Sequence, residues 1–353
     1  MKLLLKIGVV AVVIGMLWLA ITEGDDQISG DQVITAPVQP APEINVNSLL
    51  DQLKQARNEQ DTTLLNEMQS LKGADKAILV KKLQAHDNEG NTPLLVAVYR
   101  DFIGVVPQIL AALQEAELDI RHQHNFKYNT VLHVARTKPM IDLLIPYMTG
   151  ILEETTRDAE VLQNKPDGNS PLFLARTSEI AESLETSKFP LHVSDETNNK
   201  NQTPLMFMVS APSLDYTPME GVEIMPPPTS SDEAQKRKES ENQTRREIAN
   251  NFIMDAIKND NKSVKVSGES TPIFEVKDLD GNTIFHLLAK SNLDPAIIVE
   301  LIENIKKNYG ENNDAVKTIL ADKNNAQQTA RDIAEASTNK DTLDDVINAL
   351  SYT

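Results

Sequence analysis

The residues that could perform chemistry are few in this chain, and cysteine is absent altogether. Without cysteine there are no disulfides, iron–sulfur clusters, thiolate zinc sites or cysteine nucleophiles. His122 and His124 could place two imidazoles near one metal ion, since histidine is a common metal ligand. No third ligand lies at a suitable spacing in the sequence, so we predict no metal site and interpret the pair as part of a polar turn.

A second candidate is the segment Asp278-x-Asp280-Gly281-Asn282, which resembles the opening of a calcium loop. An EF-hand requires a bidentate glutamate at its twelfth position, where this chain has Ala289. A tight turn explains the same residues. The sequence also lacks the G-x-S-x-G, Walker A, H-E-x-x-H and Rossmann glycine motifs. We therefore predict no catalytic residues, no cofactor and no small-molecule substrate, and expect that the protein is not an enzyme.

Composition narrows the classes of partner. Of 353 residues, 40% are hydrophobic and 24% charged, which is typical of a chain that mostly folds. Acidic residues outnumber basic ones by 52 to 34, giving a net charge of -18, so the chain would repel a phosphate backbone and we predict no nucleic-acid binding. One basic cluster, 236–238 with Arg245 and Arg246, alternates with glutamates; it is either a self-paired helix or a docking patch for an acidic partner.

The N-terminus carries Lys2 and Lys6 and then 16 residues, Ile7–Thr22, without a charge. Together with Leu3–Leu5 this stretch is just long enough to cross a bilayer, which ideally takes ~20 apolar residues. The layout fits an uncleaved signal anchor, a cleaved signal peptide or a buried helix. A small-x-small cleavage site is missing. We favour a signal anchor over residues 1–22, with membrane contact through residues 3–22.

Charge around this segment predicts its orientation. Lys2 and Lys6 precede it, whereas Glu23, Asp25 and Asp26 follow it. The positive-inside rule then leaves the N-terminus in the cytoplasm and exports the rest of the chain. An exported chain without cysteine suits a bacterial envelope, so we predict a single-pass inner-membrane protein with a periplasmic domain; export after signal cleavage is the alternative.

Residues 23–46 are polar and contain three prolines, as in a flexible linker. Apolar residues at helical spacing then predict a helical N-terminal cap over 47–86, with helices at Asn47–Glu59, Thr62–Leu71 and Ala74–Leu83.

From residue 87 onward one pattern recurs. Its copies are 87–97 (DNEGNTPLLVA), 125–135 (NFKYNTVLHVA), 165–175 (KPDGNSPLFLA), 198–208 (NNKNQTPLMFM), 278–288 (DLDGNTIFHLL) and 324–334 (NNAQQTARDIA). Each copy resembles the ankyrin repeat, whose signature is T-P-L-H-x-A. Glycine or asparagine suits the positive φ of a tight turn, threonine or serine caps the next helix, and proline fits the first helical position. The resemblance implies an all-α ankyrin-repeat solenoid of about six helix–turn–helix units.

A second amphipathic helix should complete each unit. The expected segments are Val105–Leu113, Ile141–Met148, Ile180–Leu184, Ile248–Ile257, Pro295–Ile305 and Leu343–Leu350. Repeats 1–4 then occupy 87–210 and repeats 5–6 occupy 274–353, with Arg331 marking the last repeat as a solvent-facing cap. The insertion at 211–273 should combine a disordered, proline-rich loop over 211–228 with the outer helix of repeat 4.

The ankyrin resemblance also implies a function and a site. His133 and His286 should hydrogen-bond the neighbouring turn, and the concave surface should bind a protein partner, as a membrane-tethered scaffold. Phe126 is the most informative candidate, because an exposed aromatic ring is costly unless a partner or a neighbouring finger covers it. The candidate partner contacts are Asn88, Glu89, Asn91, Tyr99, Arg100, Phe126, Lys127, Asn129, Lys138, Leu279, Asp280 and Asn282. The alternative is a secreted bacterial effector or secretion-system component that uses its repeats to bind a host or apparatus protein.

Overall fold

The structure, a computed structural model, describes residues 45, 47–155, 163–165, 167–185, 197–215, 217–223, 228–258, 263–266, 269–309, 314–336 and 340–351. The predicted signal anchor and nearly all of the predicted linker lie outside the described residues. Within the described part of the chain, no helix combines the length and apolar character needed to cross a bilayer.

The chain from residue 47 begins with three short helices, α1 (Ser48–Gln55), α2 (Thr62–Leu71) and α3 (Lys76–Leu83). The Asp61 and Asp75 carboxylates accept hydrogen bonds from the first turns of α2 and α3, which fixes where these helices start. Leucines of all three helices are buried together. The Arg100 guanidinium donates to the carbonyls of Lys54 and Ala56, so the end of α1 is joined to the first repeat. The helical cap predicted over 47–86 is therefore present.

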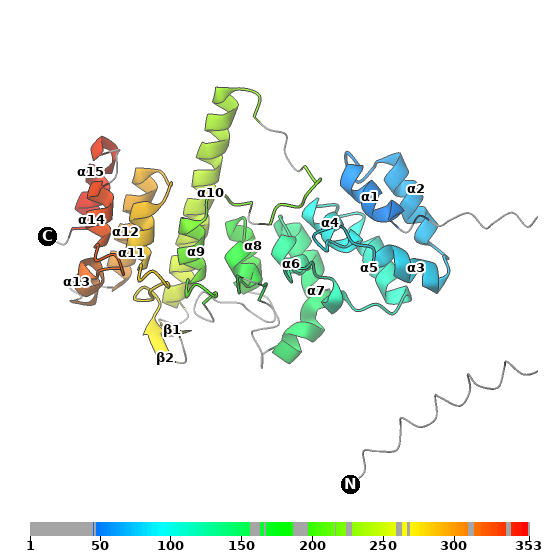
Figure 1. Ribbon diagram of the computed structural model, residues 1–353, viewed down its shortest axis with the longest axis horizontal. Helices are drawn as coiled ribbons and strands as arrows, with labels where there is room; N and C mark the ends of the chain where they lie inside the picture. The colour runs from blue at the N-terminus through cyan, green and yellow to red at the C-terminus, as the bar shows by residue number, and fades with distance from the viewer. Residues whose placement is uncertain are drawn as a thin grey trace, which may run out of the picture. The chain divides into compact units, whose positions relative to one another are not determined.

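Six helix pairs follow and form two layers (Figure 1). The inner helices are α4 (Pro93–Tyr99), α6 (Val131–Val134), η3 (Pro171–Leu174), α9 (Pro204–Ser210), α11 (Ile284–Lys290) and α14 (Ala330–Ala336). The outer helices are α5 (Val106–Glu115), α7 (Lys138–Thr155), α8 (Ser178–Glu185), α10 (Ser231–Lys258), α12 (Pro295–Tyr309) and α15 (Lys340–Ala349). We number the pairs units 1 to 6. Successive inner helices contact one another, as do the outer helices from α7 onward, and the predicted helix–turn–helix solenoid is confirmed.

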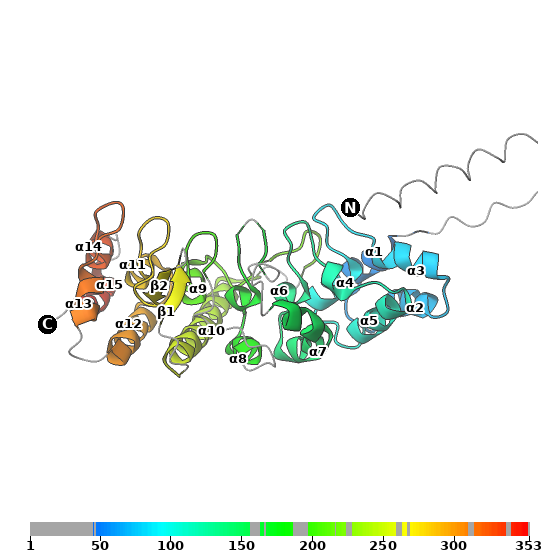
Figure 2. The same ribbon diagram turned by 90° about the horizontal axis from the view of Figure 1, so that it is seen from below.

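Inner helices start where the sequence places a capping residue. Thr92 and Thr203 accept from the backbone of their helices, with proline at the first helical position. Figure 2 shows the turns that precede the inner helices as a row of loops on the side opposite the outer helices. Apolar side chains from each inner helix, among them Leu94, Leu132 and Ala334, are buried in one continuous core between the layers.

Several elements differ from the all-α prediction. A two-stranded antiparallel hairpin, β1 (Ser263–Val266) with β2 (Glu269–Pro272), lies in the insertion. Its Val264 side chain is buried in the core. Helix α13 (Asp314–Ala321) and the single turn η1 (Ile120–His122) were not predicted either. The outer helix of unit 4 is longer than Ile248–Ile257, because the preceding charged run continues the same helix from Ser231.

The most important correction concerns the loop predicted over 211–228. Among its described residues, Thr217, Met219 and Val222 are buried, and the segment makes contacts with units 1 to 3. It is therefore packed against the repeats. The composition of the segment did not reveal this, because Asp215 and Glu220 bind residues more than a hundred positions away in the sequence.

Candidate functional site

The turns before the inner helices, which we call fingers, are closed by the same backbone hydrogen bond, although the finger of unit 3, 164–169, is one residue longer than the others. In each finger the first residue donates its N–H to the carbonyl of the last, as Asp87 does to Asn91 and Asp278 to Asn282. The next-to-last residue has a positive φ in all six fingers: Gly90, Tyr128, Gly168, Asn201, Gly281 and Gln327. The prediction of a left-handed turn residue is confirmed. Tyr128 is exceptional, because a bulky side chain rarely adopts this conformation.

Buried asparagines join neighbouring fingers in what we call the asparagine ladder. The side-chain Nδ2 of the first residue in one finger donates to the side-chain Oδ1 of the last residue in the finger before it. The pairs are Asn125 to Asn91 (3.1 Å), Asn164 to Asn129 (2.8 Å), Asn198 to Asn169 (3.0 Å) and Asn324 to Asn282 (3.0 Å). The same first residues accept backbone N–H groups of their own turns. These side chains therefore fix both the turn and the spacing between units.

The ladder follows a rule that is visible in the sequence. The first finger residue is asparagine wherever the preceding finger ends in asparagine. It is aspartate at Asp87, which has no finger before it among the described residues, and at Asp278, which follows a finger ending in Gln202. The side-chain N–H of asparagine is needed only where the asparagine oxygen of the preceding finger has to accept a hydrogen bond. This requirement explains why the other two fingers begin with aspartate.

Two histidines take the role that the ankyrin resemblance implied. Nδ1 of His133 accepts the N–H of Thr130, so Nε2 carries the proton and donates to the Asn169 carbonyl at 3.0 Å. His286 repeats this arrangement with Thr283 and with the Gln328 carbonyl at 2.9 Å. Burial lowers the pKa of His286 below its ordinary value of 6.5. This histidine is therefore held neutral and joins unit 5 to unit 6.

Two aromatic side chains are exposed on the second finger, 125–129. Phe126 is 63% exposed and Tyr128 44% exposed. The Phe126 ring meets His86 edge-on at 5.3 Å between centroids, and Tyr128 stacks on His124 at 4.5 Å. The Lys165 ammonium lies 4.4 Å from the Tyr128 ring centroid. We call His86, His124, Phe126, Tyr128 and Lys165 the finger patch.

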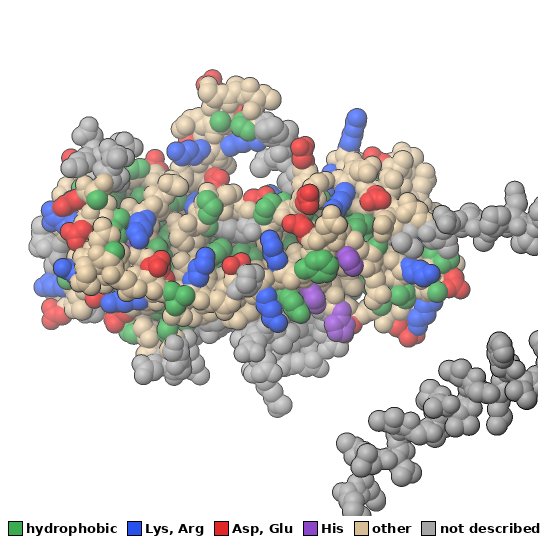
Figure 3. Space-filling view, in the orientation of Figure 1, with side chains coloured by type: hydrophobic (Ala, Val, Ile, Leu, Met, Phe, Trp, Pro, Cys, Tyr) green, Lys and Arg blue, Asp and Glu red, His purple; other side chains and the backbone are tan. Residues whose placement is uncertain are grey.

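The finger patch borders a cavity of about 460 Å³. Its lining combines the finger residues with the segment around η1, including His122 and Leu118. Histidine and hydrophobic side chains gather on the corresponding face of the molecule in Figure 3. Three histidines thus line one cavity, although no group of three or more potential ligands in the described residues is arranged to hold a metal ion. The cavity offers ring faces and imidazole nitrogens, which suits contact with another protein surface.

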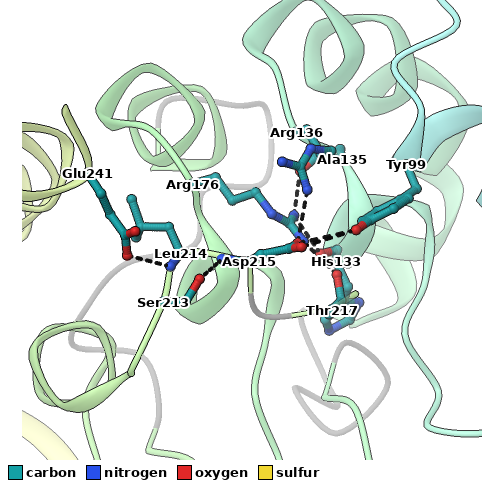
Figure 4. Close-up of polar contacts among 10 residues, drawn as sticks. All are labelled: Tyr99, His133, Ala135, Arg136, Arg176, Ser213, Leu214, Asp215, Thr217 and Glu241. Atoms are coloured by element: carbon teal, nitrogen blue, oxygen red, sulfur yellow. Dashed lines mark hydrogen bonds and ion pairs between the residues drawn. The ribbon is translucent and has the colours of Figure 1, made fainter. Parts of the chain in front are cut away.

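A second surface lies along the ends of the inner helices, where the insertion returns across units 3, 2 and 1. We call residues 213–215 and 217–223 the strap. Asp215 accepts from the Tyr99 hydroxyl at 3.2 Å and from Arg136 at 2.9 Å, and Arg176 lies 3.6 Å away (Figure 4). Burial raises the pKa of Tyr99 and the Asp215 carboxylate raises it further, so the hydroxyl stays protonated and donates.

Further contacts hold the strap along its length. The Thr217 hydroxyl accepts from Arg176 at 2.6 Å. The Glu220 N–H donates to the Glu89 carboxylate at 3.2 Å, and the Glu220 carbonyl accepts from Lys54 at 3.2 Å. Figure 1 shows the segment leaving α9 and passing toward α4 and α1. Thr217 and Met219 also line a small cavity of about 100 Å³ together with finger residues, so the strap covers part of the inner face.

The predicted partner contacts fall into three groups. Asn88, Phe126, Lys127, Lys138, Leu279 and Asp280 are exposed, and Lys138 pairs with Asp142 on its own helix. Glu89 and Arg100 are half-buried and bind the strap and the cap respectively. Asn91, Tyr99, Asn129 and Asn282 are buried, three of them in the asparagine ladder and Tyr99 beneath Asp215. We correct the predicted role of the four buried residues from partner contact to a structural role. Partner contact through the exposed residues stays a prediction.

Sequence reasoning missed Tyr128, His86 and Lys165 in the finger patch, and Arg136, Arg176 and Asp215 beneath the strap. A tyrosine at the turn position that other fingers fill with glycine was the available signal for the patch. The basic cluster on α10 is largely self-paired: Arg237 pairs with Glu233 and Arg245 with Glu241. Arg246 pairs with Glu300 of α12.

Comparison with known proteins finds similarity to solved structures only: no protein-family model and no curated protein matches the chain. The ankyrin repeat protein EF0377 is 14% identical, over 87% of this chain and 98% of that one, with a TM-score of 0.34. A chain in the complex of the predatory endopeptidase Bd0816 from Bdellovibrio bacteriovorus with the immunity protein Bd3460 is 17% identical, over 86% and 96%, with a TM-score of 0.35. The ankyrin repeat domain of Bcl-3 is 14% identical, over 74% and 99%, with a TM-score of 0.30.

Proposed function

We propose that the protein is an interaction scaffold that binds another protein through the finger patch. The observation that carries the proposal is the exposure of Phe126 and Tyr128 beside a cavity of about 460 Å³. Exposed aromatic rings grouped around a concavity are typical of binding surfaces, where tyrosine and other aromatics are enriched. The partner should present an apolar side chain to the cavity and an acidic group to Lys165.

The backbone of Tyr128 supports the same proposal. Its φ of 61° is a conformation that Gly90, Gly168 and Gly281 adopt at equivalent positions without side-chain strain. Such strain typically costs about 1–3 kcal/mol and is concentrated at functional sites. Asn201 and Gln327 adopt the same conformation in units 4 and 6, but among the six described fingers Tyr128 is the residue that places an aromatic ring there. The exposure of this ring beside the cavity supports recognition at the finger surface.

Matched substitutions on two fingers test the proposal. Phe126→Ser should abolish capture of the partner by crosslinking pull-down from a membrane extract, with the fold retained by circular dichroism. Leu279→Ser is the control, since Leu279 is also 63% exposed on a finger but lies in unit 5. Equal capture by both variants and the unchanged chain would refute the assignment of the partner site to the finger patch.

We further propose that the scaffold is tethered to a bacterial inner membrane through residues 3–22, with its repeats in the periplasm. The support is the charge asymmetry between Lys2 and Lys6 before the apolar stretch and Glu23, Asp25 and Asp26 after it. A reporter that is active only outside the cytoplasm, fused after Thr353, should be active. An active cytoplasmic reporter at the same position would contradict both the orientation and the periplasmic location.

A further inference from the structure

The strap places one carboxylate, that of Asp215, on three side chains that belong to the repeat units. We propose that Tyr99, Arg136 and Arg176 form a recognition site for an acidic, extended segment of another protein, and that the strap closes this site with the chain's own Asp215. The proposal goes beyond the finger patch, because it concerns different residues and can be tested without the partner that the fingers bind.

The site is built to receive a carboxylate. Two guanidinium groups and one phenolic hydroxyl converge on Asp215, at 2.9, 3.6 and 3.2 Å (Figure 4). Arg176 is only 6% exposed, and Tyr99 is buried. A buried cation requires a compensating anion, so this site needs a carboxylate whether the chain itself or another protein provides it.

The receiving residues are held in place by groups other than the strap. One Arg176 nitrogen donates to the carbonyls of Ala135 at 3.0 Å and His133 at 3.5 Å, at the end of the preceding inner helix. The Arg136 guanidinium lies over the Tyr99 ring, 5.1 Å from its centroid. These contacts belong to units 1, 2 and 3 themselves. The site therefore keeps its geometry when the strap departs, as a binding site for a separate molecule must.

The strap is itself suited to be displaced. Asp215 remains 40% exposed at its side chain, so a competing carboxylate can approach from solvent. Residues 211–223 carry three acidic residues and no basic one. Of these, the Asp215 carboxylate pairs with Arg136 and Arg176, whereas Lys54 contacts the Glu220 backbone carbonyl. An acidic segment from another protein would be attracted to the same two arginines.

The strap also shows what the partner segment should look like. Asp215 supplies the carboxylate, and two residues later the Thr217 hydroxyl accepts from the second Arg176 nitrogen. Two residues beyond, Met219 is buried against the repeats. A segment with an acidic residue, a hydroxyl at the second following position and an apolar residue at the fourth fits the site.

A synthetic fluorescent peptide with the sequence of residues 211–223 tests the proposal by fluorescence anisotropy. The full chain with residues 213–222 replaced by a Gly/Ser linker of equal length should bind the peptide saturably. The unchanged chain should bind at least about tenfold more weakly, because its own strap competes at high effective concentration. The peptide with asparagine in place of Asp215 should lose about tenfold or more in affinity, as loss of a charge-assisted hydrogen bond predicts.

Two variants make the result decisive. Arg136→Gln in the linker chain should weaken peptide binding about tenfold without unfolding the protein, since this side chain lies over the Tyr99 ring at the surface. Asp215→Asn in the otherwise complete chain provides a test that does not depend on the linker chain folding, and it should increase peptide binding relative to the unchanged chain.

Three outcomes would overturn the proposal. They are equal affinity for the aspartate and asparagine peptides, no gain of binding in Asp215→Asn, and a dimer of the unchanged chain that forms by exchange of straps. Failure here leaves the finger patch untouched, because none of these measurements involves Phe126 or Tyr128.

Discussion

Replacing Asn125 with aspartate changes one group of a buried side chain and tests whether the asparagine ladder couples neighbouring units. The retained Oδ1 still accepts from the N–H groups of Lys127 and Asn129, both at 3.0 Å. The amide that donates to Asn91 Oδ1 at 3.1 Å becomes a carboxylate oxygen. The substitution therefore keeps the hydrogen bonds of the turn. It changes only the contact between units, from a hydrogen bond to two opposed acceptors.

The expected cost follows from what is lost at this contact. The lost hydrogen bond contributes about 1 kcal/mol net, and leaving two buried acceptors opposed adds about 1–3 kcal/mol. We expect destabilisation of about 2–4 kcal/mol at pH 7. Asn125→Ala should cost at least as much, because it removes the two turn hydrogen bonds as well. A double-mutant cycle with Asn91→Ala should give a coupling free energy of about 1 kcal/mol.

Urea denaturation followed by circular dichroism at pH 4 and pH 7 distinguishes this explanation from a general packing defect. Burial opposite the Asn91 oxygen favours the protonated carboxyl, whereas the two turn N–H groups favour the carboxylate; we expect burial to prevail and the pKa to lie above its unfolded value of about 3.9. Its protonated form can donate to Asn91, so the deficit should be small near pH 4 and appear as pH rises through the raised pKa. The deficit of Asn125→Ala, measured against the unchanged chain, should not depend on pH. A pH-independent deficit in Asn125→Asp, or none at all, would refute the ladder.

The other predictions concern the core, a buried histidine and a finger contact. Leu132→Ala should cost about 2–5 kcal/mol by urea denaturation, since this buried leucine leaves a cavity between the layers; a cost below 1 kcal/mol would mean that the site collapses freely. Because the folded-state pKa of His286 is lowered, stability should fall as pH drops from about 6.5 toward that lower value, and a His286→Asn variant should lack this component. Gly90→Ala should be far more destabilising than Gly73→Ala in thermal denaturation: both glycines have a similar positive φ, but a Cβ at position 90 would lie 2.6 Å from the Phe126 ring, whereas nothing lies within 4 Å at position 73. Equal losses would show that backbone strain alone sets the cost.

The repeat units could be predicted because their signals are local. Gly90 permits the turn, Thr92 caps the helix and Pro93 occupies its first position, all within four residues. The same logic located the inner helices of the other units. The short inner helices of units 2 and 3 end early because Ala135 and Ala175 adopt extended backbone angles. Arg176 then turns back to the carbonyls of the preceding unit.

The strap could not be predicted because its stabilisation is non-local. Asp215 binds Tyr99, 116 positions earlier, and Glu220 binds Glu89, 131 positions earlier. Proline content and the absence of periodicity correctly indicate that this segment forms no helix or strand of its own. They carry no information about a carboxylate site assembled from three repeat units. The asparagine ladder is an intermediate case. The pattern of asparagine and aspartate can be read from the sequence, but only the structure shows that the asparagines hydrogen-bond from one finger to the next.

The solenoid can carry such a strap because contacts between its units do not depend on the connection between α9 and α10. Helix α9 contacts η3 and α11, and α10 contacts α8 and α12, so each layer continues past the insertion. Arg245 of α10 donates to the carbonyls of Met208 and Ala211, which fixes the point where the insertion leaves the inner helix. Lengthening a connection costs only about 0.6 kcal/mol for each doubling of its length. A segment long enough to reach Lys54 therefore places an acidic group on the arginine site at small entropic cost, without disturbing the repeats that form the site.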